Sequence, residues 1–236
     1  MKIRLMLILA LAPWGGAPSA SDGRSPALQA EVTVTSDYLF RGYSQSEGDP
    51  VLQAGLRYRH ASGFFVGGWA STVRFAYDDM IGDPRRAEIR GSTGYARPVG
   101  QNWFWNALLV RYEFPGSDDR LDTSYTEAQV SAQYRELIST TIAYGPRYLG
   151  RDGAGLFGEV TAGYPLPFNL DLSVGIGYAE LDPSRANHFY GHAELGRTFG
   201  PISVNLGYYD SDGIPIPPWG ELVDGRWVLG ITAQFP

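Results

Sequence analysis

The stretch "VTSDYLFRGYSQSEGDP" (34–50) places two charged residues, Asp37 and Arg41, in a segment that otherwise alternates between polar and apolar residues. This alternation is typical of a β-strand, in which successive side chains point to opposite faces. A carboxylate and a guanidinium form charge-assisted hydrogen bonds with one another or with a charged solute, and both are costly against apolar surroundings. The two residues therefore indicate that one face of the segment is polar and enclosed.

Residue types that support catalysis or metal binding are otherwise sparse. The chain has three histidines and no cysteine, which excludes disulfides and thiolate metal sites. His188 and His192 are four residues apart, which on a strand separates them by about 13 Å, too far for one metal ion. No serine can be paired with a histidine, and no phosphate loop or carboxylate pair stands out. We therefore expect no enzyme activity, no cofactor and no metal.

The segments that position the charged residues all have the period of strands. About twelve segments of roughly ten residues alternate between polar and apolar, and turn residues separate them. In 52–60, for example, Leu52 and Leu56 share one face while Arg57 and Arg59 share the other. No helical periodicity follows the N-terminal apolar segment. The other clear segments are 126–134, 170–181, 202–210 and 227–235.

The connections between these segments alternate in length. The long ones are 44–50, 76–84, 115–122, 150–155, 182–188 and 211–225, and the short ones between them are 61–63, 100–102, 135–136, 167–169 and 200–201. Long loops at one end and tight turns at the other are typical of bacterial outer-membrane barrels. The sequence therefore predicts an all-β fold, a single transmembrane antiparallel β-barrel of about 12 strands. Its short turns and N-terminus are expected to be periplasmic, and its long loops extracellular.

Three features favour apolar side chains that face lipid and polar ones that face the lumen. The only lysine is Lys2, and the polar faces carry arginine, which suits paired or enclosed charges. Twelve apolar faces would overfill a closed interior, since a wall roughly 24 Å across leaves a lumen of about 10 Å or less. Aromatic residues also collect at the strand ends, as in two membrane-interface girdles. They are Tyr38, Phe40, Tyr112, Phe114, Tyr178, Tyr208 and Trp227 near the long loops, and Phe64, Trp103, Phe104, Tyr134, Phe168, Phe199 and Phe235 near the short turns.

The same alternation predicts which charged residues line the lumen. Opposed rows of arginine and carboxylate would form a polar constriction that orients a passing solute, and the alternative is a salt-bridged plug that stabilises a closed barrel. Inward glycines favour open space in this reading; they are Gly55, Gly94, Gly163, Gly175, Gly177, Gly207 and Gly230. The predicted lumen-lining residues are Asp37, Arg41, Arg57, Arg59, Glu88, Arg90, Arg111, Glu113, Glu127, Arg147, Glu159, His192 and Glu194.

The N-terminus has the pattern of an export signal. A short basic start, the apolar run "LMLILALAPW" and the small residues "GGAPSA" predict a signal peptide over 1–20, followed by a linker over 21–30 and the barrel over 31–236. Its apolar run of about ten residues is too short for a transmembrane helix. The expected location is the outer membrane of a Gram-negative cell. Expected partners are outer-membrane lipid, lipopolysaccharide, the barrel insertion machinery and small solutes.

The opening stretch also resembles a known family. Ser36, Asp37, Tyr38, Phe40, Arg41, Gly42, Ser44 and Gln45 match the S-D-Y-x-F-R-G-x-S-Q motif of the TorF-type porin family of proteobacteria. "VRYEFPG" (110–116) and "AYGPRYLG" (143–150) are similar to strand ends of that family. The resemblance implies an outer-membrane barrel with a porin function and no defined substrate.

The function expected from these patterns is a porin-like channel for passive diffusion of small polar or charged solutes. One alternative is a surface-binding protein or adhesin that acts through the loop "SDGIPIPPWGELVDG" (211–225), with Trp219 exposed, and another is a structural barrel with a plugged lumen. A third is a barrel lipid hydrolase with Asn, His and Ser on its lipid-facing surface. Nucleic-acid binding is disfavoured because the net charge is −6, and −8 once Lys2 and Arg4 leave with the signal.

Overall fold

The structure is a computed structural model, and it describes residues 27–74, 87–115, 123–135, 137–150, 152–182, 187–212 and 224–236. The expected signal peptide (1–20) and most of the expected 211–225 loop, with Trp219, lie outside the described residues. In the described part, no helix has the length and apolar character needed to cross a membrane.

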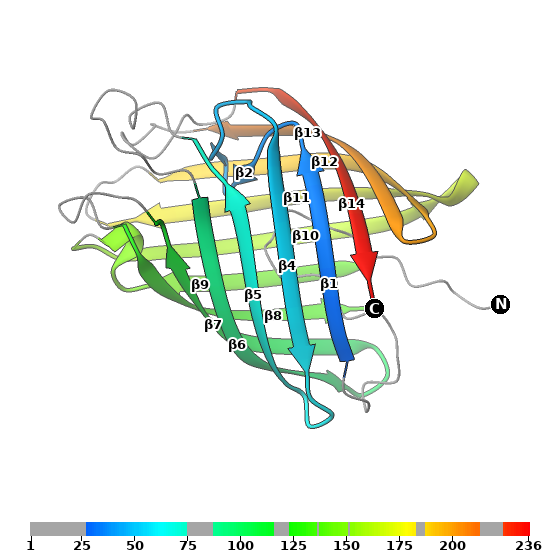
Figure 1. Cartoon of the computed structure of the whole chain (residues 1–236), viewed down its shortest axis with the longest axis horizontal. Helices are drawn as coiled ribbons and strands as arrows, with labels where there is room; N and C mark the ends of the chain where they lie inside the picture. The colour runs from blue at the N-terminus through cyan, green and yellow to red at the C-terminus, as the bar shows by residue number, and fades with distance from the viewer. Residues whose placement is uncertain are drawn as a thin grey trace.

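Within the described residues, twelve strands form one closed antiparallel barrel (Figure 1), as the alternation predicted. Each strand pairs with its neighbour along the chain, and β1 pairs with β14 to close the ring. The strands are β1 (Ala27–Thr35), β4 (Val51–Arg59), β5 (Phe64–Thr72), β6 (Ala87–Val99), β7 (Trp103–Glu113), β8 (Tyr125–Tyr134), β9 (Ile138–Gly145), β10 (Gly155–Leu166), β11 (Leu170–Leu181), β12 (His188–Phe199), β13 (Ile202–Asp212) and β14 (Arg226–Phe235).

Closure leaves no unpaired strand edge, which matters because an unpaired backbone group costs several kcal/mol in hydrocarbon. The seam joins Ala30–Thr35 of β1 to 230–235 of β14. β1 begins at Ala27, so the barrel wall includes part of the stretch 21–30 that was expected to be a linker. Two short 3₁₀ turns, η2 (Tyr148–Gly150) and η3 (Pro167–Asn169), lie in the connections before and after β10.

The outer surface of the wall is apolar. Every second residue of each strand points outward, and large aliphatic side chains dominate these positions; Leu56, Val66, Leu109, Ile142 and Ile176 are each about half exposed. A soluble barrel would bury this face, whereas a lipid bilayer solvates it. The belt therefore identifies the outer face as the membrane-facing one.

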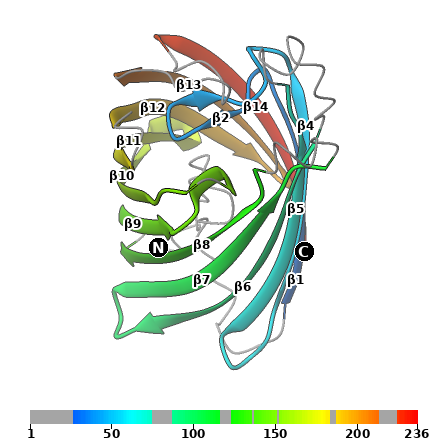
Figure 2. The same ribbon diagram turned by 90° about the vertical axis from the view of Figure 1, so that its left-hand side faces the viewer.

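The segment after β1 departs from the wall. The chain leaves the barrel at Ser36, turns inward, and forms a two-stranded hairpin of β2 (Leu39–Phe40) and β3 (Tyr43–Ser44) before β4 begins. Figure 2, which looks into the long-loop end, shows β2 inside the ring of strands. The sequence had predicted that Tyr38 and Phe40 face lipid, and this is wrong, because both are buried inside the barrel. We call residues 36–50 the inward segment.

Candidate functional site

Asp37 fixes the conformation of the inward segment. Its Oδ1 accepts hydrogen bonds from Ser44 Oγ at 2.7 Å, Ser46 Oγ at 2.8 Å and the Gly48 amide at 3.3 Å. Its Oδ2 pairs with Arg226 Nη1 on β14 at 2.7 Å. One buried carboxylate thus holds both ends of the hairpin together and joins them to the wall.

Arg41, at the tip of the hairpin, links the inward segment to β8. Its Nη1 and Nη2 donate to the two carboxylate oxygens of Glu127 at 2.6 and 2.8 Å, a bidentate pair in which Glu127 is fully buried. The guanidinium also lies 3.6 Å from the centre of the Phe157 ring. Burial by itself would lower the pKa of Arg41, but the adjacent Glu127 raises that pKa well above its ordinary value. The guanidinium therefore stays charged and remains bound to its partner.

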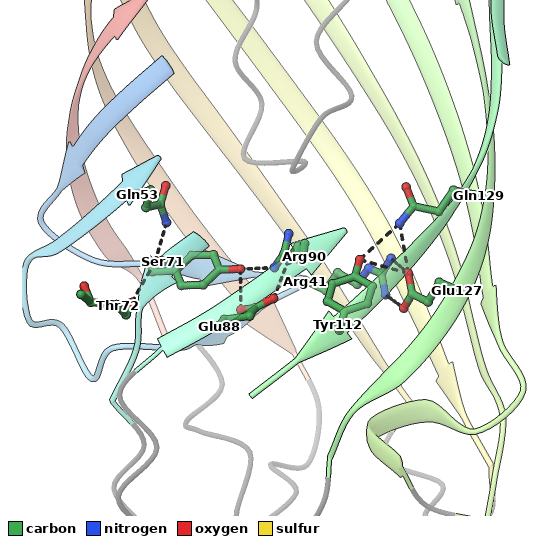
Figure 3. A network of polar contacts seen from close by, with 10 residues as sticks. Arg41, Gln53, Ser71, Thr72, Glu88, Arg90, Tyr112, Glu127 and Gln129 are labelled. Carbon is green, nitrogen blue, oxygen red and sulfur yellow. Dashed lines mark hydrogen bonds and ion pairs between the residues drawn. The ribbon is translucent and has the colours of Figure 1, made fainter. Parts of the chain in front are cut away.

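A second buried pair lies beside the first on the wall of β6, and Figure 3 shows the two pairs close together. Arg90 donates from Nε to Glu88, and its Nη2 donates to the hydroxyl of Tyr38 in the inward segment. Tyr38 in turn donates to Glu88 at 3.1 Å. The Arg90 guanidinium lies 4.3 Å from the Trp69 ring centre and 4.7 Å from that of Phe40, so cation–π contacts surround it.

Apolar side chains fill the space around these pairs. One buried cluster combines Tyr38 and Phe40 of the inward segment with side chains that point inward from β4 to β8 and from the residues that follow them. Leu39 packs on the opposite side against Tyr209 and Val228. Among the described residues, the long-loop half of the lumen is therefore a packed core. The wall residues of the first cluster are Val51, Phe65, Trp69, Val73, Leu108, Val110, Tyr112, Phe114 and Tyr125.

The short-turn half of the lumen is more open and more polar. Inward side chains such as Asn106, Gln133 and Thr141 stay partly exposed there, although they point into the barrel. Hydroxyl and amide pairs link neighbouring strands, for example Thr33 with Thr232 at 2.8 Å. This half forms a polar vestibule, which we define as the lumen between the inward segment and the short turns.

Charges in the vestibule are divided between two sides. Arg57 and Arg59 lie on the inner face of β4, with Glu31 of β1 beside Arg57, whereas Glu159, Asp171 and Glu194 lie on the inner faces of β10, β11 and β12. β4 and β10 are six places apart in the ring of twelve, so they face each other across the lumen. A solute in the vestibule therefore passes between a basic side, with two arginines and one carboxylate, and an acidic side with carboxylates alone, which orients a dipole.

The inward glycines do not mark open space as expected. A methyl group at Gly175, Gly177 or Gly207 would clash with the ring of His192, Tyr190 or Tyr209, respectively, because ring atoms lie next to each of these positions. At Gly94 the Ala107 carbonyl, the Leu108 Cβ and the Phe65 ring together leave no room for a methyl group. These glycines make room for large rings on the neighbouring residues, so that interpretation was wrong for them. At Gly230 nothing lies within 4 Å of such a methyl group, as the sequence reading expected.

Ten of the thirteen predicted lumen residues lie inside the barrel. These are Asp37, Arg41, Arg57, Arg59, Glu88, Arg90, Glu127, Glu159, His192 and Glu194.

The other three were placed wrongly. Arg111 and Glu113 point outward and pair with each other at 2.6 Å, each about half exposed. Toward the long loops the inner face of β7 is apolar because it packs against the inward segment, so the rule that polar faces point inward fails there. Arg147 follows the end of β9 and is exposed in the loop.

The aromatic girdles are also confirmed only in part. Tyr178, Tyr208 and Trp227 point outward near the long loops, but Tyr112 and Phe114 belong to the internal core, as Tyr38 and Phe40 do. Near the short turns, Phe64, Trp103, Tyr134, Phe168, Phe199 and Phe235 point outward, while Phe104 faces the lumen.

Four residues of the internal network were not predicted from the sequence. Arg226 pairs with Asp37, and His188, expected in a loop, is the first residue of β12 and hydrogen-bonds through Nε2 to the Arg41 carbonyl at 2.8 Å. Tyr112 and Gln129 donate to Glu127 at 3.3 and 3.1 Å. Alternation places Gln129 on the same face as Glu127, which was an available signal. For the residues that contact the inward segment no such signal was available, because the segment itself was expected to be part of the barrel wall.

Fold and lumen together define a transmembrane β-barrel of twelve strands with an internally packed N-terminal segment. The chain belongs to the family described as bacterial protein of unknown function (Gcw_chp), whose model matches residues 20–235. A search of the curated proteins gives no match.

Solved structures of similar fold are outer-membrane barrels. The KdgM porin is 8% identical with a TM-score of 0.56, over 88% of this chain and 99% of that one. The NanC porin is 10% identical with a TM-score of 0.52, over 89% and 100% of the two chains. The COG4313 outer membrane channel from Pseudomonas putida F1 is 10% identical with a TM-score of 0.51, over 93% and 100%. At these identities the likeness concerns the fold.

Proposed function

We propose that this protein is a porin-like channel of the Gram-negative outer membrane that carries small polar or charged solutes by passive diffusion. The observation that carries the proposal is the polar vestibule, with a basic and an acidic side, inside a wall whose outer face is apolar. In a plugged barrel such amides and charges would be buried in pairs, whereas several of those in the vestibule stay partly exposed. The fold shared with the KdgM and NanC porins supports the same function.

The same proposal covers the setting of the channel. A signal peptide over 1–20 would direct export, the barrel insertion machinery would assemble the barrel, and lipid and lipopolysaccharide would surround it. We also place the chain with the TorF-type porins. In support, the residues of the S-D-Y-x-F-R-G-x-S-Q motif build the inward segment: Asp37 holds its turn, Arg41 anchors its tip, and Gly42 has a φ of +84°, which favours glycine.

The inward segment closes the channel in the present conformation. It fills the long-loop half of the lumen and reaches β6, β8, β12 and β14 through hydrogen bonds. Conduction then requires that the segment move away from at least part of the wall. The open state is the minor one, so we expect brief, infrequent openings.

The specific solute is a further question. The KdgM porin has been solved in complex with disordered oligogalacturonate. The vestibule here carries both signs of charge, with arginines on β4 and carboxylates on β10 to β12. That distribution favours small dipolar or zwitterionic solutes over a strongly anionic chain.

A permanently plugged barrel is the second candidate function, and the tight packing of Tyr38, Phe40 and Arg41 favours it. A lipid hydrolase has less support. His188 and His192 face inward, and His60 lies in an exposed turn where its Nδ1 contacts Ser62 Oγ at 2.8 Å and accepts from the Ser62 amide at 3.2 Å. Those contacts form a local cap of the turn.

Single-channel recording of refolded protein in planar bilayers tests the channel. An engineered zinc site that joins the inward segment to the wall makes the test specific. The rings of Tyr43 on the inward segment and His188 on β12 lie 5.0 Å apart between centres. Two imidazoles that share a zinc ion have centres about 5 Å apart, given Zn–N bonds of about 2.0 Å. In the Tyr43→His variant, zinc should stop the openings and EDTA should restore them, whereas the wild-type channel should ignore zinc.

The outcomes separate the candidates. If correctly folded protein, shown by heat-modifiable gel mobility, never conducts as wild type or as the variant, the channel is rejected in favour of the plugged barrel. Conductance that zinc leaves unchanged in the variant would keep the channel but reject the inward segment as its gate. Release of fatty acid from phospholipid in detergent would instead support the hydrolase.

A further inference from the structure

Two exposed arginines lie among aromatic side chains on the outer face of β6 to β8, at the short-turn end. Arg97 on β6 pairs in register with Trp105 on β7, and both side chains point outward. Arg135 is in the turn after β8, with its guanidinium 5.3 Å from the centre of the Tyr134 ring. Tyr134 itself lies 5.0 Å from Trp103. We call these five residues the arginine–aromatic patch.

Contacts with the neighbouring short turn hold one guanidinium of the patch in place. Arg135 Nε donates to Asn102 Oδ1 at 3.0 Å, and the Arg135 amide donates to the Asn102 carbonyl at 2.7 Å, which ties two neighbouring short turns together. Neither Arg97 nor Arg135 forms an ion pair with a carboxylate among the described residues. Trp103 and Trp105 are 46% and 45% exposed, so the rings beside the arginines are available to a ligand.

The two ends of the outer face differ in charge. Among the described residues, the outward charges at the short-turn end are three arginines, Arg97, Arg135 and, on β12, Arg197. Glu136 is not among the described residues. At the long-loop end, exposed carboxylates such as Glu180 and Asp210 dominate. A phosphate group is therefore attracted to one end and repelled from the other.

The chemistry of the patch matches a phospholipid headgroup. Guanidinium groups bind phosphate through paired N–H donors, and tryptophan and tyrosine favour the depth at which headgroups lie. Outward aliphatic side chains, Leu109 and Val130 among them, continue from the patch toward the middle of the wall, where acyl chains would lie. We propose that the arginine–aromatic patch binds the headgroup of an anionic phospholipid in the periplasmic leaflet. The inference rests on the proposed membrane location and does not depend on conduction.

Phosphatidylglycerol is the probe that tests this proposal. Protein folded in phosphatidylcholine vesicles is compared with protein folded in vesicles that also contain phosphatidylglycerol, and the lipid retained on the protein is counted by native mass spectrometry. A basic residue near a membrane surface changes affinity for anionic lipid roughly fivefold, so the pair changes it roughly 30-fold. We expect the Arg97→Gln, Arg135→Gln variant to lose the preference for phosphatidylglycerol by about that factor.

Two matched variants make the result specific. Arg111→Gln removes an exposed outward arginine at the other end of the barrel and should keep the full preference. Arg97→Lys keeps the charge but loses the paired donors, and should fall between the wild type and the double variant. Arg97→Lys also provides the test of the patch if the double variant does not fold.

The proposal is overturned if wild-type protein retains both lipids equally, or if the double variant keeps its preference. Equal loss in Arg111→Gln would show a nonspecific charge effect and would overturn it as well. Failure to insert into phosphatidylcholine vesicles at all would count against the membrane location itself, and so is distinguishable from failure of the patch.

Discussion

Replacing Arg41 with methionine should release the tip of the inward segment. The substitution removes the guanidinium that donates to both oxygens of Glu127 at 2.6 and 2.8 Å and leaves that carboxylate buried. Tyr112 and Gln129 still donate to Glu127, but neither carries a positive charge. The packed conformation is thereby destabilised more than any conformation in which water reaches Glu127.

The magnitude follows from the burial of the pair. Breaking a buried ion pair by removal of one partner costs about 3–5 kcal/mol, because an uncompensated charge remains. Arg41 also loses its contact with the Phe157 ring at 3.6 Å, although methionine retains part of that packing. Since about 1.4 kcal/mol is a tenfold change in an equilibrium, the closed state should lose roughly 100- to 4,000-fold in population relative to the open one.

The assay is the open probability of single channels, with urea unfolding in vesicles as the second measurement. Arg41→Met should raise the open probability steeply and lower the unfolding free energy by no more than about 3–5 kcal/mol. The matched control is the double change Arg41→Met with Glu127→Met, which removes both charges and should recover much of the closed state. An Arg41→Met protein with unchanged openings and unchanged stability would refute the reasoning, as would a double variant no better than the single one.

Two further predictions concern the edge of the hairpin and the outer wall. Gly42→Ala should also favour opening, because the new Cβ would lie 2.9 Å from the Ser211 Cβ in the closed state. The backbone at this position has a φ of +84°, which costs about 1–2 kcal/mol for a residue other than glycine. Single-channel recording measures the open probability, and an unchanged value would contradict this prediction. Arg111→Gln with Glu113→Gln should leave ion preference unchanged, since this exposed outward pair is worth about 0–1 kcal/mol; a shifted reversal potential would show that the pair faces the lumen after all.

The wall could be predicted from the sequence because lipid imposes a simple rule on it. Outward positions of every strand meet the same apolar solvent, so segments such as 170–181 alternate cleanly, and the unequal connections separate the two ends. The ring of twelve strands and most of the enclosed charges follow from that rule. The enclosed charges Arg57, Arg90 and Glu127 were predicted because an outward position in lipid would cost each of them several kcal/mol.

The inward segment could not be predicted by the same rule. Inside the barrel, the surroundings change from water to packed side chains partway along a strand. The alternation of polar and apolar residues does not indicate where this change occurs. On β7 near the long loops the inner face is apolar and the outer face carries an ion pair, so Arg111 and Glu113 were assigned to the lumen while Val110 and Tyr112 fill it. The polar run Ser44–Gln45–Ser46 looked like an extracellular loop, although its hydroxyls bind buried Asp37.

The bond from Asp37 to Arg226 spans 189 positions of the chain and lies beside the seam where the first and last strands meet. Ser36 reinforces it, with its amide and hydroxyl both bonded to Leu229 at 2.9 and 3.0 Å. The last strand of the chain thus holds in place a segment that lies near the N-terminus. A molecule that lacks its final strand therefore has an open seam and also lacks the bond that holds Asp37 to the wall, and completion of the barrel supplies both.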